Sequence, residues 1–251
     1  MKAQHGGPAS LDNIPLIRME ALSQKRIFFG HQSVGADIID GIHDIMNQFS
    51  RVRLSIKRTR APKDFDRPLF AESCIGRNEN PKSKIDDFLA IIENGVGSKV
   101  DIAFYKLCYV DIGPATDVEA LFTYYKAVMD RLQEEFPHVR FVHCTVPLTK
   151  MDSGIKLAMK KLLGKDGGSN ANLKRAAYNG KIVQTYGPHG NVFDIARLES
   201  TFQSGTRMVR RIRGQDCYGL ISDYTNDGGH LNPTGRVIVA KGLLVLLQAI
   251  P

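Results

Sequence analysis

The chain has 251 residues, 43% of them hydrophobic and 24% charged, which is typical of a globular protein with a sizeable core. The formal net charge is +8, but the basic residues are dispersed, and the densest cluster, residues 207–213, contains no aromatic side chain. We therefore expect no nucleic-acid partner. No apolar stretch is long enough to cross a membrane, so we also expect no membrane span.

The amino-terminal residues predict a leader rather than part of the core. Residues 1–12 are polar and contain glycine, and residues 13–24 predict a short helix. We assign residues 1–25 to a leader and lead-in helix, and residues 26–251 to one α/β domain. The leader has no apolar signal region, so the protein is either cytoplasmic or exported with its signal already removed, and the sequence leaves the localisation open.

Strand-like and helical stretches alternate through the first part of the domain. Apolar runs with β-branched and aromatic residues predict strands, and apolar residues at a spacing of three and four predict helices. The strands are expected at residues 26–29, 52–59, 100–107 and 140–148, with helices at 38–49, 83–93 and after Asp117. The stretch 61–80 is rich in turn residues and predicts an irregular segment.

The second part of the domain is less regular. Residues 150–180 are polar and basic, which predicts an excursion over the surface with a short helix at 156–163. A further helix is expected at 172–186, a short fifth strand at 192–195 and a closing helix at 233–248. Residues 199–220 give no assignable pattern.

This alternation predicts a flavodoxin-like three-layer α/β/α sandwich with a mainly parallel sheet of about five strands. Functional residues of such folds gather at the carboxyl ends of the strands. Ser33 follows the first predicted strand, Gly76 the second, and Tyr109 and Asp111 the third, while His230 comes after the last. We therefore expect these loops to meet at one edge of the sheet.

Asp227 and His230 form the chemically most informative pair in the chain. They are separated by two glycines, which allow a tight turn that folds the carboxylate back onto the imidazole. A carboxylate on one ring nitrogen leaves the other free to take a proton from a nucleophile such as Ser33. The alternative is a turn-forming surface pair without catalytic function.

Three blocks in order carry a resemblance to a known family. They are Ile27-Phe28-Phe29-Gly30 running into a serine loop, a glycine after the second strand, and Asp227-x-x-His230 before the last helix. Together they resemble the SGNH/GDSL hydrolase superfamily. The resemblance implies that Ser33 is the nucleophile, His230 the base and Asp227 its orienting carboxylate. It also implies an oxyanion hole built from the Ser33 and Gly76 amides and an asparagine side chain, with no cofactor.

Two departures from the family pattern affect the expected site. The loop reads Gly30-His31-Gln32-Ser33, with one residue more than the usual Gly-Asp-Ser. Cys108-Tyr109-Val110-Asp111 stands where the family has Gly-x-Asn-Asp, so a valine replaces the asparagine, and Asn78 is the nearest substitute. We assign oxyanion or substrate binding to a set of five residues: Gly76, Asn78, His31, Tyr109 and Asp111.

Two further side chains near these loops allow alternatives. His31 either lines the pocket or holds the loop by hydrogen bonding. Lys106, at the end of the third predicted strand, is expected to extend to the surface rather than to bind substrate.

Metal and disulfide chemistry are less strongly indicated. No His, Asp, Glu and Cys cluster has metal-ligand spacing, so no metal is expected. Cys74, Cys108, Cys144 and Cys217 include no Cys-x-x-Cys pair. Cys108 and Cys144 are expected as buried free thiols, although one or two disulfides remain open if the protein is exported.

The sequence therefore predicts a serine ester hydrolase that removes acyl or acetyl groups from a carbohydrate or a small ester. Its partner would be a small-molecule or glycan ester, and the oligomeric state is open. Two alternatives on the same fold remain. One is a non-catalytic carbohydrate-binding or interaction module, and the other is an O-acyltransferase.

Overall fold

The computed structural model describes residues 16–50, 52–152 and 168–251. Most of the predicted leader and the expected helix at 156–163 lie outside these ranges. The core of the fold is a six-stranded sheet in which all pairs are parallel, in the order β2-β3-β1-β4-β5-β6. The strands are β1 (Arg26–His31), β2 (Ile56–Arg58), β3 (Leu69–Cys74), β4 (Ile102–Tyr105), β5 (Arg140–Cys144) and β6 (Val192–Phe193).

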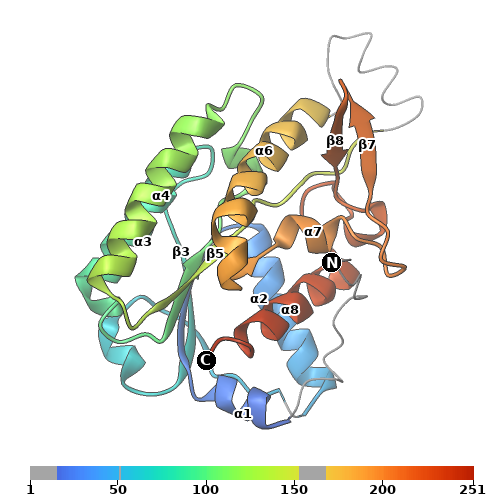
Figure 1. Ribbon diagram of the computed structural model, residues 1–251. Coiled ribbons are helices and arrows are strands. Elements are labelled where there is room, and N and C mark those ends of the chain that lie inside the picture. Colours follow the sequence, from blue (N-terminus) through green and yellow to red (C-terminus); the bar gives the residue numbers. More distant parts are fainter. Residues whose placement is uncertain (1–15, 51, 153–167) are drawn as a thin grey trace.

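Helices cover both faces of the sheet, as Figure 1 shows. One layer consists of α1 (Leu16–Ser23), α2 (Val34–Gln48), α7 (Ile195–Glu199) and α8 (Pro233–Leu247). The other consists of α3 (Pro81–Ile91), α4 (Val118–Glu135) and α6 (Ser169–Tyr186). The predicted three-layer sandwich is therefore confirmed, with six parallel strands instead of about five.

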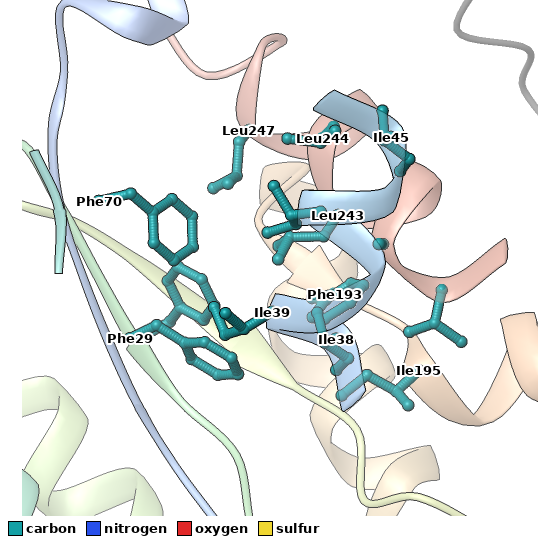
Figure 2. Packing of buried hydrophobic residues seen from close by; sticks show 14 of the residues in the cluster. Phe29, Ile38, Ile39, Ile45, Phe70, Phe193, Ile195, Leu243, Leu244 and Leu247 are labelled. Atoms are coloured by element: carbon teal, nitrogen blue, oxygen red, sulfur yellow. The ribbon is translucent and has the colours of Figure 1, made fainter. Parts of the chain in front are cut away.

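The pleat of the central strands explains the two cores. Successive side chains of a strand point to opposite faces, so β1 contributes Phe29 to one core and Phe28 to the other. Phe29 lies among residues of α2 and α8 (Figure 2), whereas Phe28 stacks on Phe88 of α3 at a centroid distance of 6.2 Å. Because both faces are covered, these strands read as nearly continuous apolar runs.

Helices α2 and α8 pack against each other although they come from opposite ends of the chain (Figure 2). Ile38 and Ile45 of α2 share a core with Leu243 and Leu247 of α8. At the rim of this contact, Arg236 Nε donates to Asp44 Oδ2 at 2.7 Å. The serine loop precedes α2 and the Asp227–His230 loop precedes α8, so this packing brings the two loops together.

The prediction of an irregular segment at 61–80 was wrong. It contains a short helical turn at Pro62–Asp66 and then β3, which pairs with both β1 and β2. The charged residue inside the strand, Glu72, is buried between a histidine and an arginine, and such a residue breaks the apolar pattern that marks other strands. The second predicted strand, residues 52–59, corresponds to the shorter β2 at the edge of the sheet. Gly76 therefore follows β3 and not the second predicted strand.

The unassigned stretch 199–220 contains a separate antiparallel hairpin. It pairs β7 (Val209–Ile212) with β8 (Gln215–Tyr218). Three of the basic residues of the 207–213 cluster make local contacts there: Arg207 lies over the Tyr218 ring, Arg210 donates to the Asp152 carbonyl, and Arg211 pairs with Asp216. The cluster therefore serves the hairpin's own packing in this structure.

Candidate active site

Ser33 occupies the turn between β1 and α2, at the carboxyl edge of the sheet. Its backbone has φ 54° and ψ −117°, a conformation that residues other than glycine rarely adopt. As the residue that caps α2, it stands at the positive end of a 15-residue helix, where the first amides have no partner within the helix. The local fold thus presents a strained serine beside a favourable place for negative charge.

A chain of two hydrogen bonds links Ser33 to the terminal loop. The Ser33 Oγ lies 2.7 Å from His230 Nε2, and His230 Nδ1 lies 2.6 Å from Asp227 Oδ2. A carboxylate accepts the proton of Nδ1, which leaves Nε2 as the acceptor for the serine hydroxyl. This is the order that a base needs to deprotonate a nucleophile.

The loop from Thr225 to His230 is folded around the Asp227 carboxylate. Its Oδ1 accepts from the amides of Gly229 and His230, each at 2.8 Å. These amides and the His230 side chain hold the pKa of the Asp227 carboxyl well below its usual range. Gly228 has φ 93°, which the tight turn requires and a glycine adopts without strain.

Asp37 of α2 fixes this loop to the helix that follows the serine. Its Oδ2 accepts from the Leu231 amide at 2.9 Å, and burial raises the pKa of the Asp37 carboxyl. The contact joins residues 194 positions apart, so no local pattern in the sequence could have indicated it. Asp37 therefore holds the two parts of the site in register.

Tyr109 lies beside the imidazole, as expected for the loop after β4. Its ring meets the His230 ring edge-on at a centroid distance of 5.8 Å. The site is open, because the His230 and Asp227 side chains are 45% and 56% exposed. Tyr109 thus packs against an imidazole that remains accessible to solvent.

The loop after β3 is bound to the serine loop, but the backbone amide of its glycine, Gly76, already has a hydrogen-bond acceptor. Gln32 Nε2 donates to the carbonyls of Ile75 and Gly76, each at 2.7 Å. The Gly76 amide donates to Asp87 Oδ2 at 2.9 Å. The expectation that this amide faces an oxyanion is therefore wrong in this structure, because a carboxylate occupies it.

His31 is buried, with 1% of its surface exposed. Its Nε2 lies 3.0 Å from Glu72 Oε2, and Glu72 also accepts from Arg58 Nε at 2.8 Å. Burial lowers the pKa of the imidazole to about 3, so it is neutral near pH 7. Of the two alternatives for His31, the structure supports the loop-holding role, since a buried ring cannot contact substrate.

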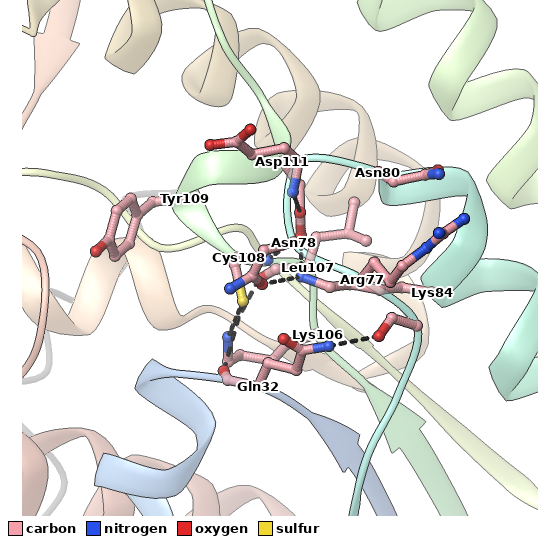
Figure 3. A network of polar contacts seen from close by, with 12 residues as sticks. Gln32, Arg77, Asn78, Asn80, Lys84, Lys106, Leu107, Cys108, Tyr109 and Asp111 are labelled. Atoms are coloured by element: carbon pink, nitrogen blue, oxygen red, sulfur yellow. Dashed lines mark hydrogen bonds and ion pairs between the residues drawn. The ribbon is translucent and has the colours of Figure 1, made fainter.

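Asp111 and Lys106 are also buried, contrary to their expected positions (Figure 3). Asp111 Oδ2 accepts from Lys84 Nζ at 2.6 Å, so its carboxylate is not available to a substrate. Lys106 Nζ lies 3.2 Å from Cys108 Sγ and is fully enclosed, because the strand end packs under the loops instead of reaching the surface. Asn78, by contrast, is exposed, and its Oδ1 accepts from Lys84 at 2.8 Å.

The described residues also bear on metal binding, disulfides and membrane insertion. No group of His, Cys, Asp and Glu in the described ranges could hold a metal ion. Within those ranges no disulfide joins the cysteines; Cys74 is exposed, and Cys108, Cys144 and Cys217 are buried. No helix among the described residues is both long and apolar enough to span a membrane.

Comparison with solved structures identifies the fold. A GDSL-like lipase from Bacteroides thetaiotaomicron superposes with a TM-score of 0.57 at 12% identity, over 93% of this chain and 95% of that chain. The chain has the fold of the SGNH/GDSL hydrolases. A Streptococcus pneumonia protein provisionally described as a platelet activating factor gives a TM-score of 0.51 at 14% identity, over 92% of this chain and 90% of that chain. No family model and no curated protein matches the sequence.

Proposed function

We propose that the protein is a serine ester hydrolase. The observation that carries this proposal is the hydrogen-bonded chain from Ser33 Oγ through the His230 imidazole to Asp227, with distances of 2.7 and 2.6 Å. His230 takes the serine proton, Ser33 attacks the ester carbonyl, and the alcohol leaves with the proton returned by His230. Water then attacks the acyl-enzyme with the same base.

The negative charge on the carbonyl oxygen requires hydrogen-bond donors at the edge of the sheet. The Ser33 amide is the first, because it stands at the amino end of α2. Asn78 is the second, since the Gly76 amide is bound to Asp87. Tyr109 forms a wall beside the imidazole for the substrate.

The substrate class is the acyl or acetyl ester of a carbohydrate or of a small alcohol. The exposure of His230 and Asp227 supports a substrate that lies across an open site, as an ester group on a glycan does. The similarity to a protein described as a GDSL-like lipase supports ester chemistry in general. An acyltransferase would use the same residues, with an acceptor alcohol in place of water.

A fluorophosphonate probe tests the nucleophile directly, because it reacts with activated serines. We expect labelling at Ser33, found by peptide mass spectrometry, together with turnover of p-nitrophenyl acetate. Both should disappear in Ser33→Ala and in His230→Ala. Ser222, which lies in the short helical turn at Ser222–Tyr224, offers a matched control, and Ser222→Ala should change neither.

Three results would redirect the proposal. Labelling at another serine would keep the enzyme and discard this site. Absence of both labelling and turnover of short-chain esters would favour the non-catalytic binding module. Turnover that rises when a sugar alcohol is added, with the acyl group recovered on that sugar, would identify a transferase.

A further inference from the structure

A fully buried ion pair lies beneath the loops that follow β3 and β4 (Figure 3). Lys84, in the first turns of α3, and Asp111 both have 0% side-chain exposure, and Lys84 Nζ lies 2.6 Å from Asp111 Oδ2. Removing two charges from water costs several kcal/mol per ion, and such pairs are often no more stabilising than apolar residues. The pair therefore calls for an explanation other than stability.

Asp111 ties the two loops to each other. Its Oδ1 accepts from the Glu79 amide at 2.9 Å, and its Oδ2 accepts from the Cys108 amide at 2.6 Å as well as from Lys84. Glu79 belongs to the loop after β3 and Cys108 to the segment after β4. One carboxylate thus sets the distance between two segments at the carboxyl edge of the sheet.

Lys84 fixes the orientation of the Asn78 carboxamide. A lysine ammonium donates hydrogen bonds and accepts none, so the atom of Asn78 that lies 2.8 Å from Lys84 Nζ must be the oxygen Oδ1. The Nδ2 amino group is then directed away from Lys84, with its two donors. No hydrogen bond from this nitrogen occurs within the described part of the chain.

The Asn78 loop is also bound to the residue before the nucleophile. Gln32 Nε2 donates to the carbonyls of Ile75 and Gly76, and Cys108 Sγ lies 3.5 Å from the Gln32 carbonyl. The loop after β3, the loop after β4 and the serine loop are therefore one connected unit. A displacement of Lys84 would therefore be transmitted to the Asn78 carboxamide within this unit.

We propose that Lys84 and Asp111 are positioning residues for the oxyanion hole, and that they hold the Asn78 Nδ2 donor toward the Ser33 acyl group. The carboxamide takes the place of the Gly76 amide, which is bound to Asp87. This inference rests on the proposed esterase function and specifies how its transition state is stabilised. Neither lysine nor aspartate contacts substrate, because both are buried.

A double-mutant cycle between Asn78 and Lys84 tests the inference, with kcat and KM for p-nitrophenyl acetate as readouts. Removing one oxyanion donor costs about 10²–10³ in kcat, so we expect this loss in Asn78→Ala with little change in KM. Lys84→Met should show a similar loss. If Lys84 acts through Asn78, then Asn78→Ala should cost less than about tenfold in the Lys84→Met background. Equal effects in both backgrounds would overturn the inference.

Two more variants keep the test informative if Lys84→Met does not fold. Asn78→Asp preserves the contact with Lys84 and replaces the donor by an oxygen, so it should lose kcat as Asn78→Ala does. Lys84→Arg keeps the charge but has a planar fork of different geometry, so kcat should fall in a folded protein. Wild-type kcat in either variant would contradict the proposal.

Failure of this inference can be told from failure of the proposed function. If Ser33→Ala abolishes turnover while the Asn78 and Lys84 effects are independent, only the positioning role fails. If Ser33→Ala retains turnover, the nucleophile itself is wrongly assigned, whatever the cycle gives.

Discussion

At the scale of single residues, Asp227 performs two tasks with its two oxygens. Oδ1 closes the loop by accepting two backbone amides, and Oδ2 accepts the imidazole proton. The loop geometry therefore fixes the carboxylate before it acts on His230. Because these amides also lower the Asp227 pKa, the carboxylate stays ionised at neutral pH and does not compete for the proton that His230 takes from Ser33.

The proposed role of Asp227 predicts the effect of Asp227→Asn. An amide has nearly the same shape, but it cannot hold Nδ1–H as a carboxylate does. In a serine protease this substitution costs about 10⁴ in kcat, and we expect a loss of that order for ester turnover. The fold, followed by circular dichroism, should be retained. A variant with nearly full activity would show that another group, such as Asp223, orients the imidazole.

The sequence indicated the three hydrogen-bonded residues of the candidate site, but not all of the residues that surround them. Ser33, Asp227 and His230 could be found because a motif and the order of the elements identify them. The Asp87–Gly76 and Asp37–Leu231 contacts join distant residues through side chains with no recognisable pattern. Consequently the sequence could not indicate that the Gly76 amide is bound to Asp87 or that Asp111 is buried.

At the scale of elements, the α2–α8 contact determines whether the two halves of the site meet. Ser33 directly precedes α2, and His230 comes three residues before α8. The helices approach closely at Gly41, where a Cβ would overlap the Arg236 carbonyl and lie 2.9 Å from Ala240 Cβ. The absence of a side chain at Gly41 thus permits the spacing at which the Ser33–His230 hydrogen bond forms.

This close approach predicts that Gly41→Ala destabilises the protein. Overpacking in a tight contact typically costs about 1–3 kcal/mol, which outweighs the gain in helix propensity. Gly180 in α6 offers a matched control, because a Cβ there meets nothing within 4 Å. Gly180→Ala should stabilise by roughly 0.5–1 kcal/mol. Denaturant unfolding of both variants checks the pair, and a Gly41→Ala variant as stable as Gly180→Ala would contradict the packing argument.

The element predictions succeeded where the chain carries a strong periodic signal. The amphipathic pattern identified α2, α4 and α8 because a whole face of each helix is buried. It missed β3, where the buried Glu72 is compensated by His31 and Arg58 from two neighbouring strands. A charge neutralised by distant partners looks, in the sequence, like a residue of an exposed loop.

At the scale of the whole molecule, the core contains several ionisable groups held in their neutral forms. Burial lowers the pKa of His31 and of His143 to about 3, and it raises the pKa of Glu199 to about 8. The histidines bind protons in the unfolded state below pH 6.5 but not in the folded state, so stability is lost as the pH falls from 6.5 toward 3. Glu199 acts in the opposite direction.

The raised pKa of Glu199 predicts a loss of stability as the pH rises. It is fully buried at the end of α7, where one carboxyl oxygen accepts from the Leu148 amide and the other, Oε2, has no partner among the described residues. The folded protein keeps this proton up to about pH 8, whereas the unfolded chain releases it above the ordinary value of 4.5. Between these values the folded state binds more protons, so the contribution of Glu199 to the free energy of unfolding falls by at most about 1.4 kcal/mol per pH unit.

Glu199→Gln removes this titration and keeps the acceptor for Leu148. We expect the variant to gain stability relative to the wild type as the pH is raised from 5 to 8, measured by denaturant unfolding at several pH values. Glu135, exposed at the end of α4, provides a control with the same Glu-to-Gln exchange at an exposed position, and Glu135→Gln should give a difference that hardly varies with pH. If the difference in stability between Glu199→Gln and the wild type were equally independent of pH, the buried carboxyl would not be protonated in the folded protein. Lys106 and Arg175, which favour its charged form, would then have to compensate for its burial.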